Sequence, residues 1–424
     1  MKTRFLLIGL LSLIAVACAD PELEVMTDKS DPVTTQSVRQ RTLEEALTSA
    51  ENWFAMMDDE TRGIPRRIKS VEYVSSASRT RSGDIDTLMY LVNYDDDQGF
   101  ALLGRPSTSK EIYAISGEGA LDMSDTVYNK PLAMFMASAR EDAQIAIPIP
   151  PGITLPPGMK DSLDYVSDTR LLRKVAPMLP DNVSKWSQGY PYNFYCKNIN
   201  NHRGLVGCGP VAVGMLMAFY KQPTKIENSV YDWNRIIKDD LVLIVADFLE
   251  KISGEKYLNC SYKDWDNRIT EGRMITRTFS QFGFGMGGVW NGQPLYGITQ
   301  GQLIDNIQSL LDFMQVGTNL AKPAPVILWE EKIVNNQWGG DGHFWITDGY
   351  MEYEKFIPVA PELPGKKIDP LLHMIWGWGG TANGYYTYLK SSKLSPIEDP
   401  ELESGAPNQY GNLGLYGKYI TFHD

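Results

Sequence analysis

Histidine, cysteine and clustered basic residues are all scarce in this sequence. Only 4 histidines and 4 cysteines occur among 424 residues, and 40 Lys and Arg stand against 52 Asp and Glu, for a formal net charge of -12. A nucleic-acid-binding protein needs clustered Lys and Arg to neutralise phosphates. The sequence has no such cluster, which excludes nucleic acid as an expected partner.

The cysteines and histidines also lack the sequence spacing that is typical of metal ligands. The cysteines are scattered, and no two histidines are placed to share a helix face, as the ligands of a zinc site commonly do. We therefore expect no metal and no cofactor. The chain also has no internal repeat.

Long apolar runs are absent after the N-terminus, where no segment reaches the ~20 apolar residues of a membrane-spanning helix. Residues 1–17 combine basic residues with a short apolar run, which is typical of a secretory signal. Small residues before Cys18 resemble the lipobox of bacterial lipoproteins, in which the signal is cut before a lipidated cysteine. We expect an exported cell-envelope lipoprotein, on the outer membrane or cell surface, anchored through Cys18. An ordinary cleavable signal with an incidental cysteine is the alternative.

If Cys18 carries lipid, three cysteines remain: Cys196, Cys208 and Cys260. An odd number in an oxidising compartment leaves at least one thiol free. Such a thiol is either buried or reactive.

The first half of the chain predicts a small helix packed on an antiparallel sheet. Thr42 is a candidate N-cap with Glu45 three residues later, before a helical pattern. A second helical stretch lies at 131–144, and the Pro-rich stretch at 147–158 marks a boundary. Strand patterns occur at 87–94, 99–104 and 111–116, with a hairpin connection between the first two.

The second half predicts helices followed by a sheet, and therefore an α+β domain. Residues 210–223 are apolar around the whole circumference, which indicates a buried helix. Further helical patterns lie at 239–253 and 301–316. Strand patterns follow in PVILWE, GHFWITDGYM, LLHMIWGW and YYTYL.

Cys208 directly precedes the buried helix, in GLVGCGPVAVGM. Unpaired N–H groups and the helix macrodipole stabilise a thiolate at this position, so Cys208 is a candidate nucleophile. The alternative is a small buried residue filling a tight helix entry. The flanking Gly207 and Gly209 argue against that alternative, since they let other backbone approach closely.

A nucleophilic cysteine needs a base, and His343 is the best candidate among the four histidines. His423 is the penultimate residue, His202 lies in a polar loop, and His373 opens an apolar strand. His343 follows a glycine turn and begins a strand, so its imidazole can point into a cleft. It follows Cys208 by 135 residues, within the roughly 130–150 that separate cysteine and histidine in papain-like enzymes.

Four segments together resemble the streptopain family of papain-like cysteine proteases, in particular its Bacteroidota lipoprotein type with an N-terminal propeptide. The similarity spans about 186–390 and rests on WSQGYPYN, on GCGPVAVGMLMAFYKQPT with YDW, on GGDGHFWITDGY and on HMIWGWGGTANGYY. It implies a papain-like fold, with a helical part beside an antiparallel sheet part, preceded by a small α+β propeptide domain. It also implies hydrolysis of peptide bonds.

The resemblance assigns roles to several residues. Cys208 would attack the carbonyl and form a thioester, and His343 would pair with the thiolate and protonate the leaving amine. The Gln188 side chain and the Cys208 N–H would bind the oxyanion. Gly342, just before the histidine, is counted as a supporting residue.

Two tryptophans and one departure from the family pattern complete the predicted site. Trp376 and Trp378 would pack beside the histidine. Ile375 stands where the family usually has the asparagine that orients His343, so we expect weakened catalysis. Asp348, in an Asp-Gly pair, is predicted to be a turn residue.

These observations predict five segments along the chain. They are a signal peptide at 1–17, a lipidated N-terminus and tether at 18–40, a propeptide-like domain at 41–145, a Pro-rich linker with the processing region at 146–185, and a catalytic domain at 186–424.

Three functions remain open from the sequence. The first is an endopeptidase made as a zymogen, with protein or peptide substrates and its own propeptide as partners. The second is a catalytically silent surface protein that binds peptides or inhibits proteases. Acyl transfer to an acceptor other than water would use the same residues.

Overall fold

The computed structural model describes two groups of residues. The longer stretches are 39–57, 66–75, 87–144, 168–269, 273–282, 307–316, 324–330, 343–356, 366–387 and 389, and the short strand segments are 289–290, 293–294, 333–334, 337–338, 395–396, 409–410 and 416–418. The predicted signal peptide, Cys18, Gly342 and His423 lie outside these residues. Within them, no helix combines the length and apolarity needed to cross a membrane.

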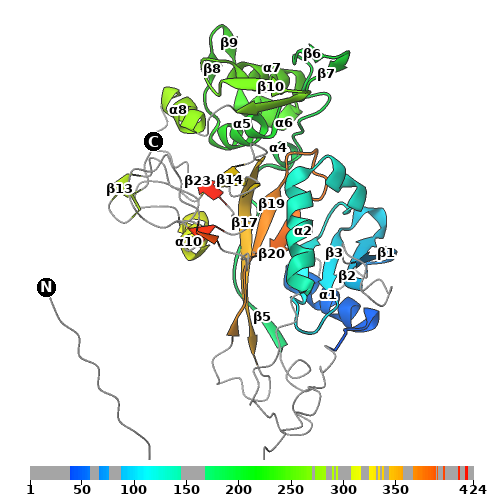
Figure 1. Cartoon of the computed structure of the whole chain (residues 1–424). Helices are drawn as coiled ribbons and strands as arrows, with labels where there is room; N and C mark the ends of the chain where they lie inside the picture. Colours follow the sequence, from blue (N-terminus) through cyan, green and yellow to red (C-terminus); the bar gives the residue numbers. More distant parts are fainter. Residues whose placement is uncertain are drawn as a thin grey trace, which may run out of the picture. The chain divides into compact units, whose positions relative to one another are not determined.

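Helices and strands are interspersed along the chain (Figure 1). The helices are α1 (Leu43–Met57), α2 (Lys130–Gln144), α4 (Asp181–Ser184), α5 (Cys208–Tyr220), α6 (Trp233–Asp239), α7 (Val242–Ser253), α8 (Arg273–Gln281) and α10 (Ile307–Val316). The main sheet contains β1 (Ile68–Ser75), β2 (Thr87–Tyr94), β3 (Phe100–Gly104), β4 (Ile112–Ser116), β5 (Asp168–Val175), β14 (Val326–Glu330), β17 (His343–Phe356), β18 (Lys366–Lys367), β19 (Leu371–Ile375), β20 (Gly384–Thr387) and β23 (Tyr416–Lys418).

Helix α1 forms where the capping pattern predicts it. The Glu45 N–H donates to Thr42 Oγ1 at 3.2 Å, and the Thr42 N–H donates to Glu45 Oε2 at 2.8 Å. This reciprocal pair satisfies two amide groups that the helix itself leaves free. The predicted hairpin between β2 and β3 is also confirmed, because the two strands pair antiparallel around residues 95–99.

One sheet joins the first and second halves of the chain. Its strand order is β1-β2-β3-β4-β20-β19-β17-β14-β23, and the two halves meet where Tyr385 and Tyr386 of β20 pair with Ile115 and Ala114 of β4. Aromatic contacts cross this junction on both faces. The ring centroids of Trp53 and Tyr353 lie 4.2 Å apart, and those of Phe135 and Tyr386 lie 4.8 Å apart.

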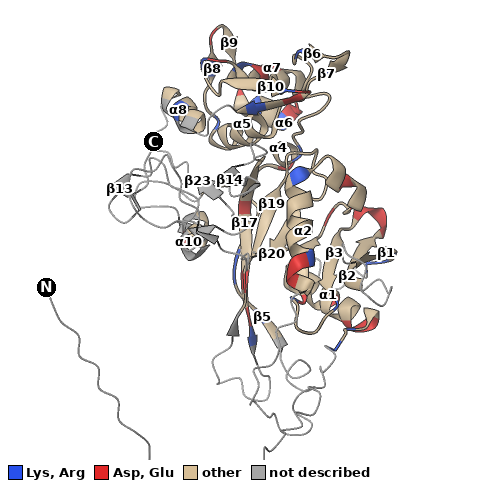
Figure 2. Cartoon of the chain, in the orientation of Figure 1, with Lys and Arg blue, Asp and Glu red and all other residues tan. Residues whose placement is uncertain are grey.

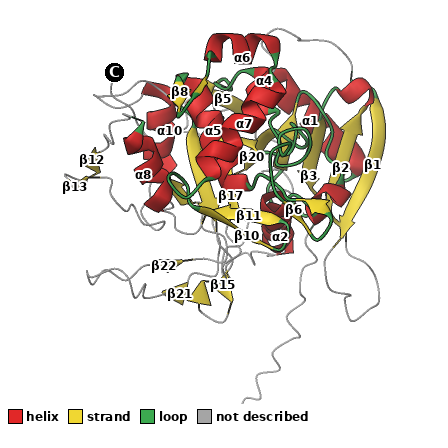
Figure 3. Ribbon diagram, turned by 90° about the horizontal axis from the view of Figure 1, so that it is seen from above, coloured by secondary structure: helices red, strands yellow, loops and turns green. Residues whose placement is uncertain are grey.

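The helical part packs around α5, which contacts α7, β14 and β17 (Figure 3). Its residues from Gly209 to Ala218 are all buried, as its apolar circumference predicts. The helix predicted at 239–253 begins three residues later, as α7 at Val242, because Asp240 takes a left-handed conformation with φ 46° and ends α6. With helices beside an antiparallel sheet, the predicted α+β class is confirmed.

Part of the range predicted as a linker is a strand. Residues 168–175 form β5, which pairs antiparallel with the second half of β17. Ion pairs reinforce this pairing: Arg173 Nε lies 2.6 Å from a Glu352 carboxylate oxygen, and Arg170 pairs with Glu354. Figure 2 shows acidic and basic residues along β17 and β5. The domain boundaries stay predictions, but the chain from Asp168 onward is anchored in the same sheet as His343.

Candidate active site

Cys208 is the first residue of α5, and a glycine places it there. Gly207 precedes the helix with φ 95°, a conformation that L side chains rarely adopt. A Cβ at this position would lie 1.9 Å from the Asn267 carbonyl oxygen. Only glycine therefore lets the start of α5 lie against β11 (Asp266–Ile269), which pairs with β10 (Cys260–Lys263).

The structure brings Cys208 and His343 together. The Cys208 Sγ lies 4.0 Å from His343 Nδ1, and the Phe344 N–H points to the same sulfur at 3.5 Å. His343 is the first residue of β17, as predicted, and is only 7% exposed. Residues 135 positions apart are thus in contact at the junction of the helical and sheet parts.

The local electrostatics of the thiol differ from the expectation. Burial raises the pKa of Cys208 to about 11, and the negative charge of Asp266 acts in the same direction. The N–H groups of Phe344, Gly209 and Cys208 itself lower the pKa, as expected at a helix N-terminus, but they do not outweigh burial. In this structure the thiol is therefore protonated at neutral pH.

Gln188 lies beside the segment that leads to Cys208. It is buried, with 4% of its surface exposed, and its carbonyl accepts a hydrogen bond from the Val206 N–H at 2.9 Å. Gln188 is therefore an interior residue. The segment around Gln188 also contacts the segment that carries Trp376 and Trp378, because the Gly379 N–H donates to the Trp186 carbonyl at 3.2 Å.

The two predicted tryptophans lie in different surroundings. Trp376 is buried, its ring lies 5.8 Å from that of Trp345 on the histidine strand, and its indole N–H donates to the Ala382 carbonyl at 3.0 Å. Trp378 is partly buried and its backbone bridges to Ser187. Both residues thus brace segments that carry His343 or Gln188. Their packing against the imidazole itself stays a prediction.

Ile375 has a clear packing role. It pairs with Ile346 across the β17–β19 ladder and is 1% exposed. Its side chain belongs to the apolar core that also contains Ile346, Ile327 and α5. The residue that departs from the family pattern therefore fills the core between α5 and the sheet.

The prediction of a turn at Asp348 is wrong. Asp348 lies inside β17 at a register irregularity and is completely buried. Its carboxylate accepts hydrogen bonds from the N–H groups of Met178 and Leu179, both at 2.9 Å, and lies 2.6 Å from His373 Nδ1. The neighbouring Gly349 allows a close crossing, because a Cβ there would lie 2.7 Å from the Val175 carbonyl oxygen.

This cluster was missed in the sequence because an Asp-Gly pair is usually a turn signal. The apolar residues that continue on both sides of it, in HFWITDGYM, were the available indication of a single long strand. His373 is partly buried and forms an ion pair with Asp348 when protonated.

The three described cysteines are all free and partly buried. Burial raises the pKa of Cys196 and of Cys260, so neither is a reactive thiolate at neutral pH. His202 is exposed in the β7 (His202–Arg203) strand, paired with β6 (Asn198–Ile199). Among the described residues, no group of His, Cys, Asp and Glu is arranged to hold a metal ion.

Comparisons with known proteins agree with the sequence resemblance. Residues 186–277 and 299–386 match the Peptidase C10 family, and no curated protein matches the chain. A mutant fragment of prointerpain A from Prevotella intermedia is similar in structure, with a TM-score of 0.46 and 14% identity over 75% of this chain and 91% of that chain. Active wild-type interpain A cysteine protease from the same organism gives a TM-score of 0.34 and 17% identity over 58% and 92%.

The family match contains Gln188, Cys208 and His343, the residues predicted for catalysis. Cys208 and His343 are also in contact in the structure, at 4.0 Å. Over residues 186–277 and 299–386 the chain therefore matches the Peptidase C10 family, which is the streptopain family, and the match supports a cysteine peptidase.

Proposed function

We propose that the protein is an exported cysteine endopeptidase made as an inactive precursor, in which Cys208 is the nucleophile and His343 the general acid and base. The observation that carries the proposal is the contact of 4.0 Å between Cys208 Sγ and His343 Nδ1 at the N-terminus of α5. A nucleophile with a base in reach is the minimum requirement of covalent catalysis.

Acylation uses both side chains. His343 takes the proton from the Cys208 thiol, and the sulfur forms a bond to the carbonyl carbon of the scissile peptide. The carbonyl electron pair moves onto oxygen. When this intermediate collapses, the C–N bond breaks, the proton on His343 passes to the leaving amine, and a thioester remains on Cys208.

Hydrolysis of the thioester reverses these roles. His343 takes a proton from water, and the resulting hydroxide attacks the thioester carbonyl. The C–S bond breaks, the new carboxylic acid leaves, and His343 returns its proton to the sulfur. Water provides the second acceptor, so no further co-reactant is needed.

Gln188 and the start of α5 would stabilise the oxyanion. Gln188 is buried, and its backbone is bonded to Val206, two residues before Cys208. The Cys208 N–H lies at the open end of the helix. One oxyanion-hole donor is typically worth about 3 kcal/mol, so a Gln188→Ala variant should retain weak activity.

Residues 41–145 would act as a propeptide that keeps the precursor latent. In support, β4 pairs with β20, and aromatic contacts join both faces of the sheet across this junction. The raised pKa of Cys208 also fits a latent form, because the thiol carries its proton. Cleavage that removes this region would then activate the enzyme.

The direct test is casein hydrolysis under reducing conditions by wild type and Cys208→Ala. We expect loss of activity in this variant and in His343→Ala. Cys196→Ala and Cys260→Ala are matched controls, because both thiols are free, partly buried and have raised pKa values. Equal hydrolysis by wild type and Cys208→Ala would show that the nucleophile is wrongly assigned.

The second candidate function is a silent surface protein that binds peptides or inhibits proteases. The protonated state of Cys208 favours it, since a permanently neutral thiol is a poor nucleophile. An epoxide probe for cysteine peptidases separates the two functions. An enzyme should be labelled selectively at Cys208 after processing, whereas a silent protein should show no selective labelling.

Export and lipidation at Cys18 complete the proposal. The signal-like residues 1–17 and the lipobox-like sequence before Cys18 support them. Metabolic labelling with a radioactive fatty acid should mark the wild type and leave Cys18→Ser unlabelled. Equal labelling of both would contradict the anchor.

A further inference from the structure

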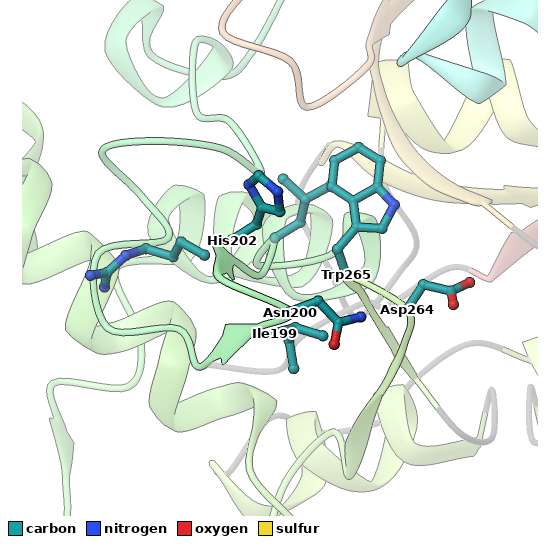
Figure 4. A pocket seen from close by; sticks show the side chains of 7 residues that line it. Ile199, Asn200, His202, Asp264 and Trp265 are labelled. Atoms are coloured by element: carbon teal, nitrogen blue, oxygen red, sulfur yellow. The ribbon is translucent and has the colours of Figure 1, made fainter.

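A pocket of about 500 Å³ lies between two hairpins of the helical part (Figure 4). The β6–β7 hairpin and the chain after it form one wall, and the turn between β10 and β11 forms the other. Cys208, His343 and Gln188 are not among the lining residues. The volume falls within the range of small-molecule binding pockets. The pocket is therefore a candidate binding site separate from the catalytic residues.

The turn between β10 and β11 gives the pocket a flat apolar surface. Trp265 lies in this turn, lines the pocket and is 49% exposed. The face of an aromatic ring carries a partial negative charge, so it attracts apolar C–H groups whose hydrogens are slightly positive. The indole ring is thus a platform on which a ring with C–H groups on its face can stack.

The β6–β7 hairpin adds two hydrogen-bonding side chains to the lining. Asn200 and His202 both line the pocket and are exposed. Within the part of the chain that the structure describes, neither side chain makes a hydrogen bond to the protein. A carboxamide both donates and accepts hydrogen bonds, and so does a neutral imidazole. The two groups are therefore free to bind hydroxyl groups of a ligand.

The two charged lining residues are directed elsewhere. The Arg203 guanidinium lies 5.4 Å from the Phe194 ring centroid, where it interacts with the aromatic face. The Asp264 carboxylate turns away from the other labelled side chains (Figure 4). The groups that remain directed at the pocket are an aromatic ring, an amide and an imidazole. This combination favours an uncharged ligand over an anion or a cation.

Both walls are held in place without a ligand. The Leu205 N–H donates to the Trp265 carbonyl at 2.8 Å, which joins the two walls. The hairpins also pack closely, because a Cβ at Gly204 would collide with the Tyr262 ring. Asn200 takes a left-handed conformation with φ 48°, which asparagine adopts more readily than most residues, and this fixes the β6–β7 turn. The pocket is therefore preformed.

The occupant must combine an apolar face with an edge of neutral hydrogen-bonding groups. A pyranose ring has this chemistry, since its C–H groups lie on its faces and its hydroxyls, which donate and accept, surround it. A purely apolar occupant would leave Asn200 and His202 without partners as it displaced their water, which costs free energy. A saccharide satisfies both groups and covers Trp265.

We propose that this pocket, the Trp265 pocket, is a carbohydrate-binding site for a neutral glycan carried by a glycoprotein substrate. A sugar ring stacks on Trp265, and Asn200 and His202 bind its hydroxyls. Leu205 lines the pocket and precedes Cys208 by three residues, so their Cα atoms are at most about 11 Å apart. A glycan held here brings the protein that carries it to the nucleophile. Only this choice of a glycoprotein rests on the proposed function.

The first experiment measures sugar binding without catalysis. Methyl glycosides of glucose, galactose, mannose and N-acetylglucosamine are added to the full-length Cys208→Ala variant, and saturation-transfer NMR records contact with the protein. Trp265→Ala, Trp265→Phe, Asn200→Ala and His202→Ala are each combined with Cys208→Ala. Tyr73→Ala is the matched control, because Tyr73 is a 60% exposed aromatic residue on β1 outside the pocket.

We expect at least one glycoside to bind, with a Kd that rises about tenfold or more in Trp265→Ala, the usual cost of removing an aromatic anchor. Asn200→Ala and His202→Ala should each weaken binding severalfold. Trp265→Phe should restore much of the affinity, and Tyr73→Ala should match the parent. Binding of no glycoside, or binding unchanged in Trp265→Ala, would overturn the proposal. So would Trp265-dependent binding of N-acetylphenylalanine amide in place of every sugar.

The second experiment identifies the source of the sugar. Asialofetuin, whose glycans end in galactose, and ribonuclease B, whose glycans end in mannose, are immobilised before and after enzymatic removal of their glycans, with dextran as a free polysaccharide. Cys208→Ala should bind one glycoprotein at least about tenfold more tightly before deglycosylation, and Trp265→Ala should remove this difference. Binding to dextran alone contradicts a glycoprotein ligand. Glycan-dependent binding supports the pocket even if wild type hydrolyses nothing, so the outcome is independent of the proposed peptidase activity.

Discussion

At the scale of single residues, the protonation state of Cys208 controls its reactivity. The pKa of about 11, compared with an ordinary value of 9.0, leaves roughly a thousandth of the thiol ionised at pH 8. Alkylation requires the thiolate. The full-length chain should therefore react slowly with iodoacetamide at neutral pH, despite the contact with His343.

This state predicts a pH profile. The rate of Cys208 alkylation in the full-length chain should rise about tenfold for each pH unit up to about pH 10, because the pKa is raised and thiolate accumulates only near pH 11. Mass spectrometry of the Cys208 peptide measures the rate. Cys208→Ala gives the background from Cys196 and Cys260, and a rate that is constant above pH 7 would contradict the profile.

Ile375 provides a second residue-scale prediction. Ile375→Asn restores the side chain that the family resemblance implies, but it places an amide in the core beside Ile346. We expect a loss of about 2–4 kcal/mol in the free energy of unfolding, from lost packing and an unpaired polar group. Urea unfolding measures this loss.

Activity on casein then shows whether residue 375 matters mainly for core packing or for orienting His343. The folded fraction of Ile375→Asn should be no more active than wild type, and Ile375→Val, a control that costs about 1 kcal/mol, should match wild type. A tenfold gain in the Asn variant would show that the orienting role outweighs packing.

At the scale of elements, Asp348 links the histidine strand to the segment that leads to Gln188. Asp348 lies five residues after His343 on β17 and holds the N–H groups of Met178 and Leu179. The chain from there runs through α4 to Gln188. Asp348 is therefore a positioning residue, which fixes one side of the site relative to the other.

Asp348→Asn should lower kcat about tenfold with little change in KM, because Gln188 would contribute mainly to the transition state. The amide keeps the volume but weakens the acceptor for both N–H groups and His373. Kinetics on a coumarylamide substrate separate kcat from KM. Glu352→Gln, which keeps the volume of a carboxylate buried on the same strand and paired with Arg173, should leave both parameters near their wild-type values. An increase in KM of Asp348→Asn as large as the decrease in kcat would contradict this positioning role.

At the scale of the whole molecule, one sheet connects the proposed propeptide to the catalytic strands. The β4–β20 pairing is short, so the aromatic contacts and the cores on both faces carry much of the association. Trp53 of α1 packs edge-to-face on Tyr353 of β17. Loss of this ring removes contact from the face of α1 that rests on the sheet.

Trp53→Ala should therefore weaken the association by about 3–5 kcal/mol and speed conversion of precursor to the processed form. Gel analysis of a time course measures the conversion. Val127→Ala, which alters an exposed residue in the same half of the chain, should process at the wild-type rate. Slower conversion in Trp53→Ala would contradict a latency role for this contact.

Local patterns in the sequence determined much of this protein. The capping box at Thr42, the apolar circumference of α5 and the alternating strands predicted the main elements, because each depends on residues close together in the chain. The motifs around Cys208 and His343 also predicted the two residues that come into contact. Family resemblance supplied Gln188, which no local pattern by itself could identify.

The tertiary structure decided the features that depend on distant neighbours. Burial of Cys208 cannot be read from the sequence. It raises the pKa of the thiol against the opposite effect of the helix N-terminus. Asp348 became a buried acceptor because the chain at 175–179 crosses β17 there, and Ile375 became a core residue because α5 covers it. Sequence thus determined which residues could react, and packing determined their charge, their partners and their access to substrate.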